Sequence, residues 1–126
     1  MRDRDTVRRA TKASVTAAVP PLRHELRVAG DTVTALLAGE IDFASAPELQ
    51  EWLSAEITAH PGRQVLVDLG GVGFIDSSAI HVFVRVRKLA DTVGSRMRLV
   101  NTDGMVQRVL QVAGVYAHLC GDPNAS

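Results

Sequence analysis

An aspartate followed by two serines, Asp76-Ser77-Ser78, stands where an apolar stretch gives way to a helical pattern of side chains. The first turn of a helix has unpaired backbone N–H groups and the positive end of the helix dipole. Asp76 or Ser77 acting as a helix cap explains these residues without any further function. A second interpretation is that Ser77 is a kinase target, since a helix start tolerates the added charge of about −1.5 to −2. Inside an interface with another protein that charge weakens binding, so the serine would act as a switch.

A third possible chemistry is nucleophilic catalysis by Ser77, as in a serine hydrolase. It requires a base beside the hydroxyl and an oxyanion hole. The chain has no glycine-flanked nucleophile elbow, and no motif links a histidine to this serine. We therefore expect that the protein is not an enzyme.

Cofactor and metal sites are not indicated either. Gly70-Gly71-Val72-Gly73 is not followed by the lysine-serine pair of a phosphate-binding loop. The histidines at positions 24, 60, 81 and 118 lack the spacing of metal ligands. We expect no cofactor and no metal, and we interpret His81 as a solvated helix residue or a partner contact.

Charge and cysteine content restrict the class of protein. The 14 basic and 14 acidic side chains cancel and aromatic residues make up only 4%, so nothing indicates direct binding of nucleic acid. The single cysteine, Cys120, has no partner for an internal disulfide, which points to a reducing compartment. No apolar run reaches the roughly 20 residues that span a bilayer. We expect a cytoplasmic protein without membrane contact, and a monomer because no second apolar face is apparent.

The domain organisation follows from length and local composition. A chain of 126 residues suits one domain. Residues 1–20 carry five basic and two acidic groups and no helical or strand period, which is typical of a flexible basic tail. We expect a single domain over residues 21–120 and a disordered end at 121–126.

A hairpin and a helix are predicted for the first half of that domain. Alternation over residues 22–28, a turn at 29–31 and β-branched residues over 32–38 predict two antiparallel strands. Ser45 and Glu48 match a capping box at the start of a helix that runs to Ala59. The apolar face of this helix is expected to comprise Leu49, Trp52, Leu53 and Ile57.

The second half alternates strands and helices. The apolar run 65–69 predicts a strand buried on both faces, and the glycines at 70–73 predict a connecting loop. A helix from Asp76 to Gly94 is expected to bury residues 79, 82, 83, 86, 90 and 93 and to expose His81, Arg85 and Lys88. A strand at 97–100 leads to a helix capped by Thr102 or Asp103, with Met105, Val109, Val112 and Ala113 inward, and no final helix is expected. The order predicts an α/β domain, a mixed sheet of about four to five strands packed against α-helices.

Three short segments carry a family resemblance. Gly39-Glu40-Ile41-Asp42, Ala46-Pro47-Glu48-Leu49 and Phe74-Ile75-Asp76-Ser77-Ser78 resemble signatures of STAS domains. More narrowly, the chain is similar to bacterial anti-sigma-factor antagonists over residues 22–118. The resemblance implies a STAS-like single domain that controls transcription by partner switching.

The resemblance also implies partners and site residues. In that family the unphosphorylated antagonist binds an anti-sigma factor and frees the sigma factor. The anti-sigma factor is itself a serine kinase that phosphorylates the first serine after the aspartate, here Ser77, and a serine phosphatase reverses the step. Asp42 matches an acidic position near the phosphosite, and Asp76 and Ser78 would share the rim with Ser77. Together with the exposed His81, these residues form the expected partner-binding set.

Two departures and one alternative accompany the resemblance. Ala79 stands where the family usually has glycine, and the final helix common in relatives is expected to be absent. The alternative keeps the STAS fold without the switch, as an accessory or scaffold subunit of a signalling or transport assembly.

Overall fold

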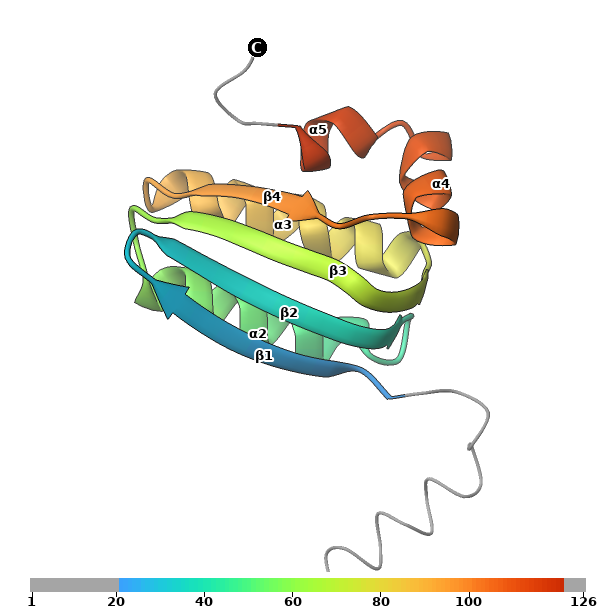
Figure 1. The fold of residues 1–126 in the computed structure, drawn as a ribbon, viewed down its shortest axis with the longest axis horizontal. Coiled ribbons are helices and arrows are strands. Elements are labelled where there is room, and N and C mark those ends of the chain that lie inside the picture. Colours follow the sequence, from blue (N-terminus) through green and yellow to red (C-terminus); the bar gives the residue numbers. More distant parts are fainter. Residues whose placement is uncertain (1–20, 122–126) are drawn as a thin grey trace, which may run out of the picture.

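A four-stranded mixed sheet forms the body of the protein, whose computed structural model describes residues 21–121. The elements are β1 (Arg23–Ala29), β2 (Thr32–Ile41), α2 (Ala46–Ala59), β3 (Gln64–Ile75), α3 (Ser77–Thr92), β4 (Arg96–Val100), α4 (Gly104–Val112) and α5 (Tyr116–Cys120). The strands lie in the order β1-β2-β3-β4; β1 is antiparallel to β2, and β2, β3 and β4 are parallel (Figure 1). The predicted α/β class and mixed sheet are confirmed. The expected basic tail, residues 1–20, and residues 122–126 of the expected disordered end lie outside the described residues.

The predicted hairpin between β1 and β2 is confirmed. Ala29 pairs with Thr32, so Gly30 and Asp31 form the turn. Gly30 has φ +60°, a left-handed conformation that glycine adopts without steric cost. A ring stack of His24 on Trp52, with centroids 4.2 Å apart, then holds β1 against α2.

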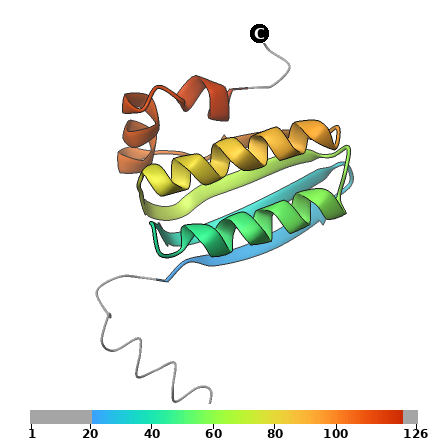
Figure 2. The ribbon, with the colours of Figure 1, turned by 180° about the vertical axis from the view of Figure 1, so that it is seen from behind.

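Helices α2 and α3 lie side by side on one face of the sheet (Figures 1 and 2). The predicted faces are correct, because α2 buries Leu49, Leu53 and Ile57 and α3 buries Ala79, Val82, Phe83, Val86 and Ala90. Trp52 and Val93, also predicted for these faces, are partly buried against the core. These side chains meet the inward residues of the strands, and at about 25 cal/mol per Å² this burial is the main favourable term for the fold. The two helices thereby acquire fixed positions relative to the ends of β2 and β3.

The prediction that residues 65–69 are buried on both faces is wrong. Val65 and Val67 are buried, whereas Leu66 and Asp68, which alternate with them along the strand and so lie on its opposite face, are partly exposed. Leu66 pairs between Thr34 and Arg98. Because Leu66 is aliphatic although it is partly exposed, the sequence contains a continuous apolar run. Such a run is also typical of a strand that is buried on both faces.

The predicted loop at residues 70–73 is also wrong, because β3 continues through the glycines to Ile75. A Cβ atom at Gly71 would lie 3.0 Å from the Cβ of Ala38 and 3.1 Å from the carbonyl oxygen of Leu37. Glycine there allows close approach of β2 rather than a turn. The register shifts between Leu36 and Ala38 and between Gly39 and Glu40 mark the same irregular stretch.

The C-terminal helices correct two further predictions. Helix α4 begins after Asp103, but the expected side-chain cap does not form. The helix buries Val106 and Leu110 and exposes Met105 and Val112. Ala113 is also exposed and Val109 is only partly buried, so the predicted inward face was wrong. Both sets have helical spacing, and contact with β3 selects between them.

The expected absence of a final helix was wrong as well. Helix α5 forms over Tyr116–Cys120 and buries Leu119 completely. Burial raises the pKa of the Cys120 thiol, although a hydrogen bond with Thr102 acts in the opposite direction. Cys120 is therefore protonated and weakly reactive at neutral pH. Within residues 21–121, no helix combines the length and apolar composition that crossing a bilayer requires.

Replacing Leu119 by alanine tests whether α5 belongs to the core. Leu119→Ala removes a fully buried side chain and should lower the free energy of unfolding by about 2–5 kcal/mol, measured by urea denaturation. The control is Val112→Ala, which truncates a side chain that is 81% exposed and should change stability by less than about 0.5 kcal/mol. Equal stability of the two variants would contradict the packing of α5.

Candidate functional site

The carboxyl ends of β2 and β3 lie next to each other at one edge of the sheet. Ile41 pairs with Ile75 in parallel register, so the two residues that follow, Asp42 and Asp76, leave the sheet side by side. Helices α2 and α3 begin within a few residues of this edge. In α/β proteins the carboxyl ends of parallel strands are the usual location of binding sites.

Asp76 is the cap of α3. Its Oδ1 accepts hydrogen bonds from the N–H groups of Ser78 at 2.8 Å and of Ala79 at 3.3 Å. The capping interpretation is therefore correct for Asp76 and not for Ser77. Its carboxylate holds the helix start in place, which makes Asp76 a positioning residue for the serines beside it.

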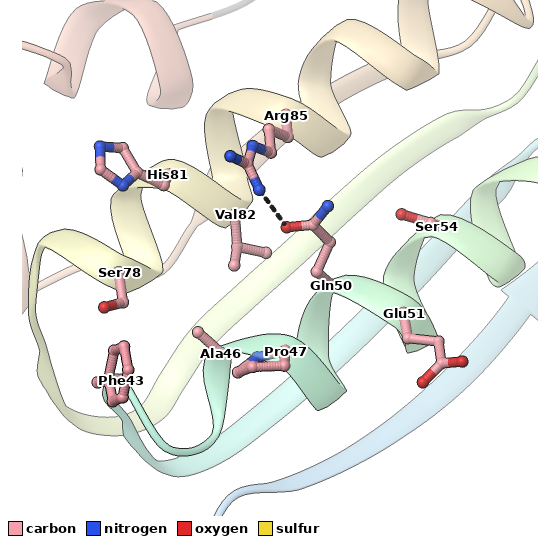
Figure 3. Close-up of a pocket in the computed structure, with 10 residues that line it drawn as sticks. All are labelled: Phe43, Ala46, Pro47, Gln50, Glu51, Ser54, Ser78, His81, Val82 and Arg85. Atoms are coloured by element: carbon pink, nitrogen blue, oxygen red, sulfur yellow. Dashed lines mark hydrogen bonds between the residues drawn. The ribbon is translucent and has the colours of Figure 1, made fainter.

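Ser77 is the first residue of α3 and is exposed to solvent. Among residues 21–121, no side chain or backbone group forms a hydrogen bond with its hydroxyl. Ser78 is partly buried and turns toward a groove between α2 and α3 (Figure 3). The structure thus distinguishes the two serines by exposure, a difference that the sequence alone did not give.

Asp42 closes the loop between β2 and α2. Its Oδ1 accepts the N–H groups of Ala44 and Ser45, both at 3.0 Å, and its own N–H donates to the Ser45 hydroxyl at 3.0 Å. That hydroxyl also donates toward the carbonyl of Glu40 at 3.2 Å. The carboxylate of Asp42 is thus occupied within the loop.

The predicted capping box of Ser45 and Glu48 does not form. Ser45 stands before α2 with φ −95° and ψ −13° and makes no side-chain cap. Its hydroxyl faces back to Asp42, while the Glu48 carboxylate lies 3.2 Å from Nε2 of His24. The backbone carbonyl of Asp42 accepts the N–H of Ala46 at 2.9 Å, so the start of α2 is held from Asp42.

A groove between α2 and α3 begins at this edge (Figure 3). His81 and Arg85 belong to its α3 wall, and the Arg85 guanidinium donates to Oε1 of Gln50 on α2 at 3.3 Å. The full lining is Phe43, Ala46, Pro47, Gln50, Glu51, Ser54, Ser78, His81, Val82 and Arg85. Of the predicted partner-binding residues, Ser78 and His81 line the groove, while Asp42, Asp76 and Ser77 lie at the sheet edge from which it starts.

Phe43 is the member of this site that sequence reasoning missed. It follows Asp42 directly, lines the groove beside Ser78 and is 81% exposed. The only signal in the sequence was a phenylalanine, one of three in the chain, in a short polar connection. Within residues 21–121 the structure forms no group of three or more His, Cys, Asp or Glu side chains able to hold a metal ion.

A family model and two similar curated proteins indicate the same family for this chain. The model of the STAS domain matches residues 23–122. The anti-sigma-B factor antagonist of Bacillus subtilis (strain 168) is 33% identical over 79 residues, which are 63% of this chain and 71% of the relative. The anti-sigma F factor antagonist of Lysinibacillus sphaericus is 29% identical over 89 residues, which are 70% of this chain and 75% of the relative.

Solved structures of the anti-sigma factor antagonist SpoIIAA have the same fold. The unphosphorylated form superposes with a TM-score of 0.67 at 21% identity, covering 82% of this chain and 90% of that chain. The phosphorylated form of SpoIIAA from Bacillus superposes with a TM-score of 0.60, also at 21% identity, covering 82% of this chain and 93% of that chain.

Removing the Asp76 carboxylate tests the division of roles at the start of α3. Asp76→Ala should lower the free energy of unfolding by about 1 kcal/mol, because the Ser78 N–H loses its acceptor and the Ala79 N–H keeps only the backbone carbonyl of residue 76. Ser77→Ala is the matched control and should leave stability within about 0.5 kcal/mol. Urea denaturation of both variants measures the difference, and a larger loss for Ser77→Ala would assign the cap to the serine.

Proposed function

The chain belongs to the STAS domain family, and from that premise we propose that it is an anti-sigma factor antagonist whose partner binding is switched off by phosphorylation of Ser77. The observation that carries the proposal is the solvent exposure of Ser77 and its lack of a capping role. Its side chain is exposed at the start of α3, while Asp76 performs the capping that would otherwise occupy a serine. A hydroxyl in this state is accessible to a kinase.

The relatives support the general role. The Bacillus subtilis and Lysinibacillus sphaericus relatives are both named as antagonists of anti-sigma factors. SpoIIAA, which shares the fold, occurs in an unphosphorylated and a phosphorylated form. We infer that this chain likewise binds an anti-sigma factor, that this partner is the serine kinase for Ser77, and that a serine phosphatase removes the phosphate. We expect this cycle to take place in the cytoplasm.

The effect of a phosphate follows from the contacts of Asp76. Its carboxylate already accepts the N–H groups of Ser78 and Ala79, so a phosphate on Ser77 finds these donors occupied. The added charge of about −1.5 to −2 therefore remains on the outer surface. If that surface is covered by a partner, leaving the charge unpaired there costs on the order of 2–5 kcal/mol. Such a cost corresponds to a roughly 30- to several-thousand-fold loss of affinity.

Ala79 does not oppose this proposal. Its side chain is 0% exposed and packs in the core beneath the first turn of α3. The methyl group that distinguishes it from the family's usual glycine therefore faces the core, away from the exposed side of Ser77. We infer that Ala79 leaves the kinase access to Ser77 open.

The predicted partner-binding residues divide into two roles under this proposal. Ser77, Ser78 and His81 contact the partner from α3. Asp42 and Asp76 act through the loops that they close, since their carboxylates accept backbone N–H groups. A serine hydrolase would instead need a base on Ser77, and within residues 21–121 no side chain forms a hydrogen bond with its hydroxyl. We therefore do not propose hydrolysis.

Phosphorylation of Ser77 is tested by incubating the protein with ATP, Mg²⁺ and each anti-sigma factor of the same genome, purified singly. Intact-mass measurement should find one added phosphate, and peptide mapping should place it on Ser77. Ser77→Ala should take up none, while Ser78→Ala, the matched control, should still be modified. If no kinase modifies the protein, the switch is refuted, and the accessory or scaffold alternative takes its place.

Binding of the anti-sigma factor is the second test. Ser77→Ala should bind like the unmodified chain in a calorimetric titration, also after kinase treatment, because it cannot acquire the charge. Ser77→Asp should bind at least about tenfold more weakly, since part of the unpaired charge is introduced permanently. Gln64→Glu adds a charge at the opposite end of β3 and should bind normally. Equal affinity of the alanine and aspartate variants would remove the mechanism.

A further inference from the structure

Phe43 has a surface exposure that the fold does not require. It is 81% exposed in the connection between β2 and α2. A single exposed apolar side chain is ordinary on protein surfaces and by itself indicates nothing. Three independent features of its surroundings, namely the rigidity of its loop, its place at a groove and its nearness to the candidate switch, distinguish Phe43.

The loop that carries Phe43 is held rigidly. Asp42 accepts the N–H groups of Ala44 and Ser45 and donates its own N–H to the Ser45 hydroxyl. These bonds close the chain on both sides of Phe43. An aromatic side chain on a preorganised loop loses little conformational entropy when it is buried in an interface, which is the property of an anchor residue.

Phe43 and Ser77 each follow an aspartate with the same pattern of hydrogen bonds. In both places an aspartate at the end of a parallel strand accepts backbone N–H groups two and three residues onward. In both places the residue directly after the aspartate is exposed. Because Ile41 and Ile75 pair in register, the two exposed residues emerge at the same edge of the sheet. A surface that covers Ser77 therefore extends toward Phe43.

The groove beyond Phe43 has two basic residues on its α3 wall, of which Arg85 carries a permanent positive charge. His81 and Arg85 line it from α3, and Lys88 continues the row of exposed side chains on the same helix. The Arg85 guanidinium donates to the neutral amide of Gln50, and among residues 21–121 it has no ion pair. Glu51 also borders the groove, but its carboxylate points away from Arg85 (Figure 3). The floor contains the apolar side chains of Ala46 and Val82.

We propose that Phe43 is the apolar anchor of the anti-sigma factor interface, seated in an apolar pocket of that partner whose carboxylates face His81 and Arg85. This inference rests on the proposed function and adds the chemistry of the partner surface. The charge of Arg85 supports carboxylates as its counterpart on the partner, since no acidic residue lines the groove from α3. A phosphate on Ser77, one helical turn before His81, would then face the partner's carboxylates and repel them.

Truncating Phe43 is the direct test. Phe43→Ala should weaken binding of the anti-sigma factor at least about 30-fold in a calorimetric titration, the loss typical of an interface anchor. Phe43→Leu, which keeps most of the apolar volume, should recover part of the affinity. Val112→Ala is the matched control, because Val112 is also 81% exposed but lies on α4. Its affinity should stay within about twofold of the unmodified chain.

Reversing a charge tests the partner's carboxylates. Arg85→Glu should weaken binding about tenfold at low ionic strength, and the difference should shrink as salt is added because salt screens exposed charges. Arg96→Glu makes the same change at the start of β4, at the amino ends of the parallel strands, and should bind normally. Urea denaturation of each variant verifies that the fold is retained.

The outcomes separate this inference from the proposed function. If Ser77→Asp weakens binding but Phe43→Ala and Arg85→Glu bind like the unmodified chain, the anchor is refuted while the switch remains. A normal affinity for Phe43→Ala alone refutes the anchor, and a salt-independent effect of Arg85→Glu refutes the carboxylates. If the unmodified chain binds none of the purified anti-sigma factors, both the proposed function and the anchor are overturned.

Discussion

The parallel pairing of β2 with β3 is the constraint on which the site depends. Ile41 lies opposite Ile75, and both side chains are buried in the core. A shift of one residue would turn the buried side chains of a strand toward the other face, so the core fixes the register. That register brings the two loops after the strands to one edge, although 34 positions separate Asp42 from Asp76 in the sequence. The position of the candidate site is thus a consequence of core packing, and the glycine at position 71 permits β2 and β3 to approach each other.

After both strands, an aspartate stabilises the start of the following helix and the next residue is exposed to solvent. At each place the aspartate side chain accepts backbone N–H groups at or just before the first turn of a helix. Because the aspartate accepts these N–H groups, the next residue is not required as a cap. The start of α3 presents a hydroxyl at Ser77, and the loop between β2 and α2 presents a phenyl ring at Phe43. The two side chains therefore combine a modifiable polar group with an apolar contact on a single rigid edge.

Sequence patterns predicted the parts of the fold in which one period dominates. The hairpin and the buried faces of α2 and α3 follow from such patterns and were confirmed. Where two patterns compete, sequence periodicity does not decide between them. Helix α4 has one apolar stripe at Met105 and Val112 and another at Val106 and Leu110, and only packing on β3 selects the second. The glycines near Gly71 suggested a loop because close strand approach and turning require the same residue. Phe43 was not predicted as a site residue because it lies in a loop, where hydrophobic periodicity cannot indicate whether an aromatic side chain is exposed.

A phosphorylation switch at a helix start can weaken binding without unfolding the protein. The effect of the added charge on the stability of the fold differs in size and sign from its effect on association with a partner. Negative charge near the first turn of a helix is worth about 0.3–1 kcal/mol of stability at an exposed position. The neighbouring Asp76 carboxylate reduces this gain, but Ser77 is exposed, so water screens the repulsion between the two groups. In an interface the same charge loses its water and opposes association by on the order of 2–5 kcal/mol. Under the proposed function, the surface position of Ser77 would make its phosphorylation nearly neutral for the isolated fold and strongly unfavourable for the complex.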